Sequence, residues 1–184
     1  MKIEQIERNY LEIKSLRELL EVTKPSTENL VSIVNPPDFQ INKFFYKQIG
    51  NKYRWKDRLI WDDKKWISYT THNDVKTFVL MEENDLVGYF EQIFNKNKFE
   101  CEIAYFGILE NYIGKKYGGY LLSEAIKISF NEGAKRVWVH TCSLDHKNAI
   151  KNYLSRGMKI FKSEKITLNN QIFLLNQDFD YSFL

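Results

Sequence analysis

The chain has 184 residues, about the length of one globular domain. Hydrophobic residues make up 43% of it and charged residues 28%, with 8 glycines and 3 prolines, a composition that excludes disordered and collagen-like chains. The formal net charge of +3 is too small to indicate a nucleic-acid partner by itself.

The sequence gives no signal for export or membrane insertion. No apolar run reaches the roughly 20 residues that span a membrane, and the stretch 1–8 is charged rather than apolar. The cysteines Cys101 and Cys142 are too few for a disulfide framework. We therefore expect a cytoplasmic protein with reduced thiols and no membrane partner.

Apolar spacing predicts the elements of the N-terminal part of the chain. Residues 3–20 carry apolar side chains three and four apart, which predicts a helix, although residues 10–13 also fit a short strand. Residues 29–34 predict a strand. The aromatic and basic stretch 39–66 predicts two helices, at about 41–49 and 62–69, with Asp62 as the first-turn acid or the cap of the second.

The remainder of the chain alternates between strand and helix patterns. Strands are predicted at 75–82, 86–94 and 99–109, followed by a glycine-containing turn at 114–119, a helix at 121–130, a strand at 137–141, a helix at 145–155, and final strands at 158–162 and 172–176. An antiparallel meander followed by strand–helix–strand indicates a mixed α/β sheet with one crossover. No repeat or linker interrupts the pattern, so we expect one domain.

The segment 102–122 runs from a strand through a glycine-containing turn into a helix. Free backbone N–H groups at the start of a helix bind phosphate or diphosphate, and glycines permit a close approach. Lys115 and Lys116 add positive charge there. The alternative is an ordinary helix entered through a glycine turn, since neither a P-loop nor a Gly-x-Gly-x-x-Gly pattern is present.

Two motifs in this order resemble the GNAT superfamily of acyl-CoA-dependent N-acyltransferases. Residues 113–118, Ile-Gly-Lys-Lys-Tyr-Gly, resemble the family's Gln/Arg-x-x-Gly-x-Gly/Ala, with Ile113 and Lys116 departing from it. Residues 149–158 match Ala-x-x-x-Tyr-x-x-x-Gly-Phe through Tyr153 and Gly157, with Met158 in place of Phe. His146 stands where the family usually has Asn, and residues 137–146 are similar to an uncharacterised bacterial branch.

The resemblance implies a fold. We expect a single GNAT-like α/β (α+β) domain over residues 1–184, with a mixed, mostly antiparallel sheet of about six to seven strands and helices on both faces. The sheet would part in a V between its fourth and fifth strands. Residues 1–27 would be an N-terminal extension, 28–70 the first strand and the acceptor-side helices, and 75–176 the cofactor-binding and catalytic core.

The resemblance also implies a reaction. An acetyl or other short acyl group would move from acyl-CoA, with acetyl-CoA as the co-substrate, to a primary amine by direct attack and without a metal. The residues expected to hold coenzyme A follow from the family's motif positions and neighbouring strand. They are Phe106, Ile108, Leu109, Ile113, Gly114, Lys115, Lys116, Tyr117, Gly118, Gly119 and His146.

The chemistry needs a base for the amine and an acid for the departing thiolate. Glu102 stands at the position of the base glutamate in the histone-acetylating branch, and we expect it on one strand face with Ala104, Phe106 and Ile108. Glu91 in the neighbouring strand is the second candidate, and either glutamate could instead be a strand-edge acid facing water. Tyr153 holds the family position of the acid, the alternative being a tyrosine that only packs on the sheet.

Other residues are candidates for the acceptor side. Tyr53, Trp55, Trp61 and His140 are expected to line the substrate wall, although the rings could simply pack the helices on the sheet. His140 and Cys142, with Asp145 and His146 nearby, could also form a Cys–His pair or a metal site, or be a strand thiol and a histidine lining the cleft.

Three functions compete at this point. The leading one is an N-acetyltransferase acting on a small-molecule or peptide amine. The second is an acyl-CoA-binding sensor or interaction module without catalysis, and the third is a nucleic-acid binder that uses the stretch 39–66. The final strands could also support a homodimer.

Overall fold

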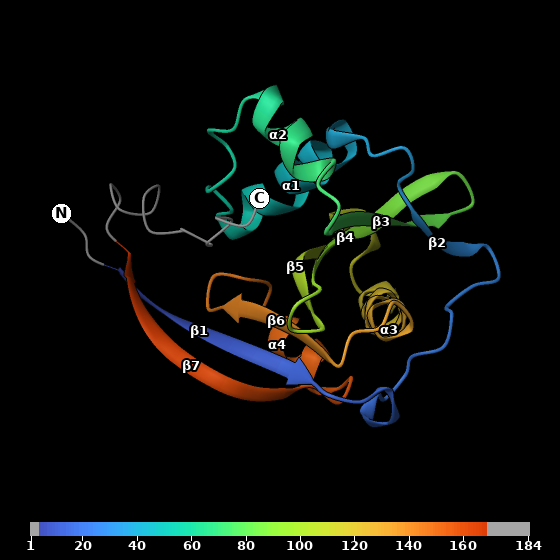
Figure 1. The fold of residues 1–184 in the computed structure, drawn as a ribbon, viewed down its shortest axis with the longest axis vertical. Helices are drawn as coiled ribbons and strands as arrows, with labels where there is room; N and C mark the ends of the chain where they lie inside the picture. Colours follow the sequence, from blue (N-terminus) through green and yellow to red (C-terminus); the bar gives the residue numbers. More distant parts are fainter. Residues whose placement is uncertain (1–3, 169–184) are drawn as a thin grey trace.

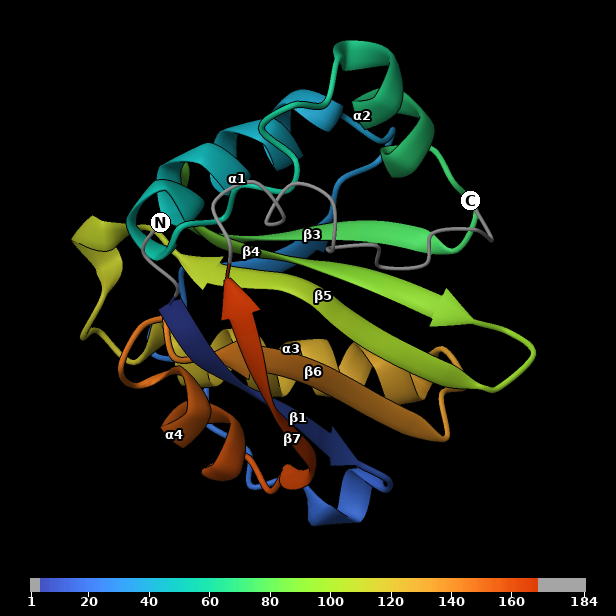
Figure 2. The same ribbon diagram turned by 90° about the vertical axis from the view of Figure 1, so that its left-hand side faces the viewer.

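The computed structural model describes residues 4–168 of the chain. Seven strands of this part form one sheet in the order β2-β3-β4-β5-β6-β1-β7 (Figures 1 and 2). All neighbours are antiparallel except β5 and β6, so the mixed, mostly antiparallel α/β prediction is confirmed. The strands are β1 (Glu4–Ile13), β2 (Asn29–Ile33), β3 (Val75–Glu82), β4 (Asp85–Asn95), β5 (Glu100–Ile108), β6 (Arg136–Cys142) and β7 (Lys159–Leu168).

Helices cover both faces of the sheet. Helices α1 (Phe39–Tyr53) and α2 (Asp63–Thr70) lie on one face, and α3 (Tyr117–Asn131) lies on the other (Figure 1). The predicted cap of α2 is confirmed, because the Asp62 side chain accepts a hydrogen bond from the N–H of Lys65 at 2.8 Å. Helix α4 (Ala149–Leu154) is shorter than predicted, since residues 143–148 form a turn and loop before it. Within residues 4–168, none of the helices has the length and apolar character needed to span a membrane.

The predicted N-terminal helix is wrong: this segment is strand β1. It pairs with β6 on one side and β7 on the other, so it fills an interior position of the sheet. Leu11 and Ile13 are buried in the core beneath α3, while Ile6 is buried on the opposite face. A strand covered on both faces loses its clean two-residue alternation, and helix-like spacing can then arise by coincidence.

The extra strand shifts the count of the later ones. The strands that the resemblance numbers fourth and fifth are β5 and β6 here, and their pairing is parallel only from Glu100–Arg136 to Glu102–Trp138. Beyond these pairs the two strands diverge (Figure 2). Of the two predicted final strands, the first corresponds to β7, and the one at 172–176 lies outside the described residues.

An irregularity in β5 accompanies this divergence. Gln92 of β4 faces Ile103, while the adjacent Glu91 faces Tyr105, so Ala104 is an additional residue in β5. Such a bulge bends a strand and interrupts the alternation of its side chains.

Because of the bulge, the side chains along β5 do not alternate as predicted. Ile103 and Phe106 both belong to the core beneath α3, although they are an odd number of residues apart. Glu102, next to Ile103, faces the side of α1 and α2, as does Tyr105. The prediction that Glu102 shares a face with Phe106 and Ile108 is therefore wrong.

A buried carboxylate fastens the α1–α2 layer to the sheet. Glu91 in β4 accepts hydrogen bonds from Asn42 of α1 at 2.8 Å and from Tyr69 of α2 at 2.7 Å. Its third partner is the guanidinium of Arg58 at 2.7 Å, in the connection between the two helices, and both side chains of this ion pair have 0% exposure. One carboxylate thus holds three consecutive segments of the chain against one strand.

We predict that Glu91→Gln lowers the free energy of unfolding by about 3–5 kcal/mol, because Arg58 would lose the carboxylate of Glu91 in a buried position. Chemical denaturation followed by tryptophan fluorescence measures the change. Asp63→Asn is the matched control: it removes the exposed partner of Lys43 and should cost about 1 kcal/mol or less. Equal losses in the two variants would refute the assigned role of Glu91.

Candidate active site

A cavity of about 420 Å³ opens where β5 and β6 part. Its walls come from those two strands, the start of α3, α4 with its preceding loop, the end of α1 and strand β1. Most of the residues predicted from the sequence to form the site line this one cavity. They are Tyr53, Trp55, Phe106, Ile108, Ile113, Gly114, Lys116, Gly118, Gly119, His140, His146 and Tyr153.

The other predicted site residues lie outside the lining. The N–H of Leu109 donates to the carbonyl of Val87 in the sheet, and the Lys115 ammonium lies over the ring of Tyr112 at 4.8 Å. Tyr117 is buried with its hydroxyl bonded to Glu82. The remaining three are Trp61, Glu91 and Glu102.

The turn before α3 presents unoccupied backbone donors to the cavity. The first N–H groups of any helix lack an intrahelical acceptor, and α3 begins without a side-chain cap. In the described part of the chain, the N–H groups of Lys116, Gly118 and Gly119 have no hydrogen-bond acceptor. These donors and the helix dipole favour a bound anion.

Lys116 stands where the family motif has glycine, and its backbone conformation is unusual for a lysine. It has φ 68° and ψ 1°, in the left-handed region that glycine adopts most easily. The backbone therefore takes the conformation that favours glycine at this motif position, although the residue is lysine.

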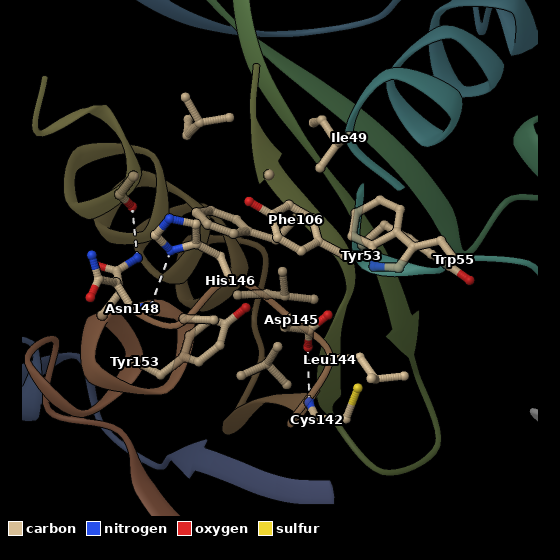
Figure 3. A pocket seen from close by; sticks show the side chains of 18 of the residues that line it. Ile49, Tyr53, Trp55, Phe106, Cys142, Leu144, Asp145, His146, Asn148 and Tyr153 are labelled. Carbon is tan, nitrogen blue, oxygen red and sulfur yellow. Dashed lines mark hydrogen bonds between the residues drawn. The ribbon is translucent and has the colours of Figure 1, made fainter. Parts of the chain in front are cut away.

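Tyr153 lies on the opposite side of the cavity from Tyr53 and Trp55 (Figure 3). Its side chain is 6% exposed, and its ring meets that of Phe106 edge to face at 6.3 Å. Burial raises the pKa of Tyr153 well above its ordinary value, and the nearby carboxylate of Asp145 raises it further. The phenol therefore keeps its proton at neutral and moderately alkaline pH.

Glu102 lies directly behind a cavity residue. Its Oε1 is 3.7 Å from Nδ1 of His140, which lines the cavity, and the Glu102 side chain is 11% exposed. Within residues 4–168, Oε1 of Glu102 accepts no hydrogen bond. The Glu91 carboxylate differs, because three donors already engage it and it is fully buried. Neither candidate base lines the cavity, but among the described residues Glu102 is the one with a carboxylate oxygen that accepts no hydrogen bond and lies beside a lining histidine.

Many aromatic and basic side chains of the stretch 39–66 are engaged in contacts within the protein. The Arg58 guanidinium lies over Trp61 at 4.6 Å and over Tyr69 at 4.0 Å, so these rings pack the layer together. The remaining wall residues Tyr53 and Trp55 reach the cavity. Four of its basic residues form ion pairs, which disfavours the nucleic-acid reading: Lys43 with Asp63, Lys52 with Glu110, Arg54 with Glu4, and Arg58 with Glu91.

The His140–Cys142 pair does not resemble a nucleophilic site. Burial raises the pKa of the Cys142 thiol, with Asp145 adding to the rise, whereas an active thiolate needs a lowered pKa. Asp145 itself is held through Oδ2, which accepts from the Thr141 hydroxyl at 2.7 Å and from the Cys142 N–H at 2.9 Å (Figure 3). Over residues 4–168, no three His, Cys, Asp or Glu side chains come together as a metal site.

Several cavity residues were missed from the sequence. Arg8 was hidden by the incorrect N-terminal helix, and Asp57 by its distance in the chain from the motifs. Asn152 lies inside the second motif, and its amide donates to the carbonyl of Gly118 at 3.1 Å. Asn152 thereby joins the two motif segments, so the spacing of the motifs was the sequence feature from which its role could have been predicted.

Comparison with known proteins agrees with this geometry. The model of the acetyltransferase (GNAT) family matches residues 38–158, more than half of the chain. No curated protein sequence matches the chain. Many solved structures share the fold.

Three of the similar structures are acetyltransferases that share the fold at low sequence identity. An aminoglycoside acetyltransferase from an uncultured soil metagenomic sample has 16% identity and a TM-score of 0.61, over 72% of this chain and 90% of that one. An IAA acetyltransferase from Bacillus cereus has 18% identity and a TM-score of 0.54, over 73% and 79%. A GCN5-related N-acetyltransferase from Sphaerobacter thermophilus has 14% identity and a TM-score of 0.63, over 88% and 51%.

The parted strands, the donor-rich start of α3 and the match over residues 38–158 lead to one assignment: the chain belongs to the GNAT acetyltransferase family.

Proposed function

We propose that the protein transfers an acetyl group from acetyl-CoA to a primary amine of a small molecule. One observation carries the proposal: the free donors at the start of α3 and the protonated Tyr153 border the same cavity between the parted strands. Two of the similar structures are named for acetyltransferases of small molecules, which supports that class of acceptor.

The N–H groups at 116–119 would hold the diphosphate of coenzyme A, with Lys116 adding charge. The exposed edge of β5 near Phe106 and Ile108 would align the pantetheine arm. Holding the thioester by its nucleotide end fixes the carbonyl in the gap between β5 and β6, where an amine can reach it.

The proposed reaction balances without a covalent enzyme intermediate. The amine nitrogen attacks the thioester carbonyl carbon, and its proton passes to the Glu102–His140 pair, directly or through water. The tetrahedral intermediate collapses by breaking the C–S bond. Tyr153 gives its proton to the departing thiolate, and solvent restores the phenol.

The direct test incubates the protein with acetyl-CoA and a panel of small primary amines, and measures thiol release together with acetylated product. Acetylated product formed at a rate proportional to enzyme supports the proposal. Tight calorimetric binding of coenzyme A without any product would instead support a non-catalytic binding module.

We predict that Tyr153→Phe lowers kcat by about 100-fold or more on an acceptor found in this way, because it removes the general acid. The raised pKa keeps the wild-type phenol protonated, so the loss should be the same at about pH 7 and about pH 9. Tyr120→Phe, in α3 and outside the cavity lining, is the control and should retain activity. Full activity of Tyr153→Phe would remove this residue from the mechanism.

We predict that Gly118→Ala weakens coenzyme A binding about tenfold or more in calorimetry while thermal stability stays close to that of the wild type. A Cβ at Gly118 would lie 3.8 Å from Asn152 and from Ile108, so the protein accommodates it, but it would enter the space beside the free donors. Gly119→Ala is the contrasting variant, because there the protein does not accommodate the added Cβ without a shift: it would lie 2.6 Å from the Arg156 guanidinium. Unchanged affinity in Gly118→Ala would place the diphosphate elsewhere.

We predict that Glu102→Gln lowers kcat/KM at least tenfold near neutral pH and that the loss shrinks as the pH approaches the acceptor's own pKa. A simple alkyl amine has a pKa of about 10.4, so at high pH it arrives already deprotonated. Glu100→Gln, on the same strand and bound to Arg136, is the matched control. A loss that does not depend on pH would indicate a structural effect in place of a base.

A further inference from the structure

The acceptor side of the cavity carries charges that the proposed acetyl transfer does not use. Strand β1 contributes Arg8 and Ile6 to the lining, and Arg54, directly after α1, also lines it. These residues lie on the face of the sheet covered by α1 and α2, whereas α3, which supplies the diphosphate donors, covers the other face (Figure 1).

Most charged groups of the lining are already engaged. Arg54 donates to Glu4 at 2.7 Å, which leaves that guanidinium partly neutralised. Asp57 accepts hydrogen bonds from the hydroxyls of Tyr46 and Tyr105. Lys116 belongs to the diphosphate turn.

Arg8 is less completely engaged: its guanidinium donates to the Tyr10 hydroxyl and helps to lower the pKa of Glu164. Among residues 4–168, no carboxylate forms an ion pair with it, and its Nε is buried without an acceptor. The residue opposite it in β7 is Glu164, but that carboxylate is engaged by Lys162 at 2.7 Å and by the Tyr10 hydroxyl at 2.6 Å. A half-buried guanidinium that forms no ion pair is costly, and a cavity ligand with an anionic group would offset the cost.

An unengaged carboxylate oxygen lies close by. Arg8 pairs in register with Cys142, and burial raises the pKa of this thiol, with Asp145 adding to the rise and Arg8 opposing it, so both charges act on one side chain. Both hydrogen bonds to Asp145 use Oδ2, and none in the described residues uses Oδ1. The cavity therefore offers one cation and one carboxylate oxygen, both from residues next to Cys142.

We infer that the acceptor is a primary amine that also carries a carboxylate, with Arg8 binding the carboxylate and Asp145 attracting the ammonium before transfer. This inference rests on the proposed function and narrows its acceptor class. Arginine suits the role because its planar fork can donate two parallel hydrogen bonds to a carboxylate. Arg8 lies outside the residues that match the family model, so it is a feature of this chain beyond the matched core.

The experiment measures kcat/KM with acetyl-CoA for amines with and without a carboxylate. The pairs are phenylalanine with phenethylamine, tryptophan with tryptamine, and β-alanine with ethylamine. In the wild type, the carboxylated member of at least one pair should be preferred by about tenfold or more, mainly through a lower KM.

Arg8→Gln should reduce this preference by about tenfold or more, and Arg8→Lys, which keeps the charge but loses the fork, should fall between the two. Arg17→Gln, at an exposed position outside the cavity lining, is the matched control and should keep the preference. Hydrocinnamate, which is phenylalanine without its amine, should compete with the acceptor in the wild type and compete at least several-fold less well in Arg8→Gln.

The failures of the two proposals are distinguishable. If both members of every pair are acetylated equally well and Arg8→Gln does not change their ratio, the carboxylate inference is wrong while acetyl transfer stands. A large rise in the Kd of coenzyme A in Arg8→Gln would assign this arginine to the cofactor and also overturn the inference. If no amine of either kind is acetylated, the proposed function fails and the inference fails with it.

Discussion

The site depends on the early end of the pairing between β5 and β6. Parallel neighbours in a sheet usually stay hydrogen-bonded along their length, but here the pairing stops at Glu102 and Trp138. The additional residue Ala104 bends β5 just beyond that point. Backbone groups that a continuous sheet would consume are thereby left facing a cavity, and side chains from both faces of the sheet reach it. The gap brings the start of α3, Tyr153 and the α1 layer to a single space.

A gap in a sheet is useful only if its walls hold still. On the acceptor side this rigidity comes from Glu91, whose carboxylate joins α1, α2 and their connection to β4. On the cofactor side it comes from Asn152, whose amide bonds the carbonyl of Gly118 and so ties α4 to α3. Buried polar groups of this kind are costly unless fully paired, but when paired they fix one arrangement of neighbouring elements. The hydrogen bond from Asn152 to Gly118 joins the segments that carry the two sequence motifs.

The sequence predicted what local patterns control. The turn at 113–119 and the helix around Tyr153 both line the cavity, because each motif lies within one short segment. Three features depend on contacts distant in sequence and were missed. The spacing of residues 3–20 could not show that β1 would pair along both edges with strands from the other end of the chain. The bulge at Ala104 depends on register with β4, and the burial of Glu91 depends on Arg58, some thirty residues earlier.

Strand β1 adds residues to the cavity that lie outside the part of the chain that matches the family model. The residues that would handle the thioester, from Phe106 to Tyr153, lie within the part that matches the family model. Arg8 and Ile6 come from a strand outside that part, yet they complete the same cavity by lying beside β6. A strand paired with β6 at this position would change the charge that an acceptor meets without moving the groups that would transfer the acetyl unit. The charge of the cavity therefore has two sources, since Arg8 comes from outside the matched residues whereas Asp145 lies within them, and an acceptor inferred from family membership alone would leave the charge of Arg8 unexplained.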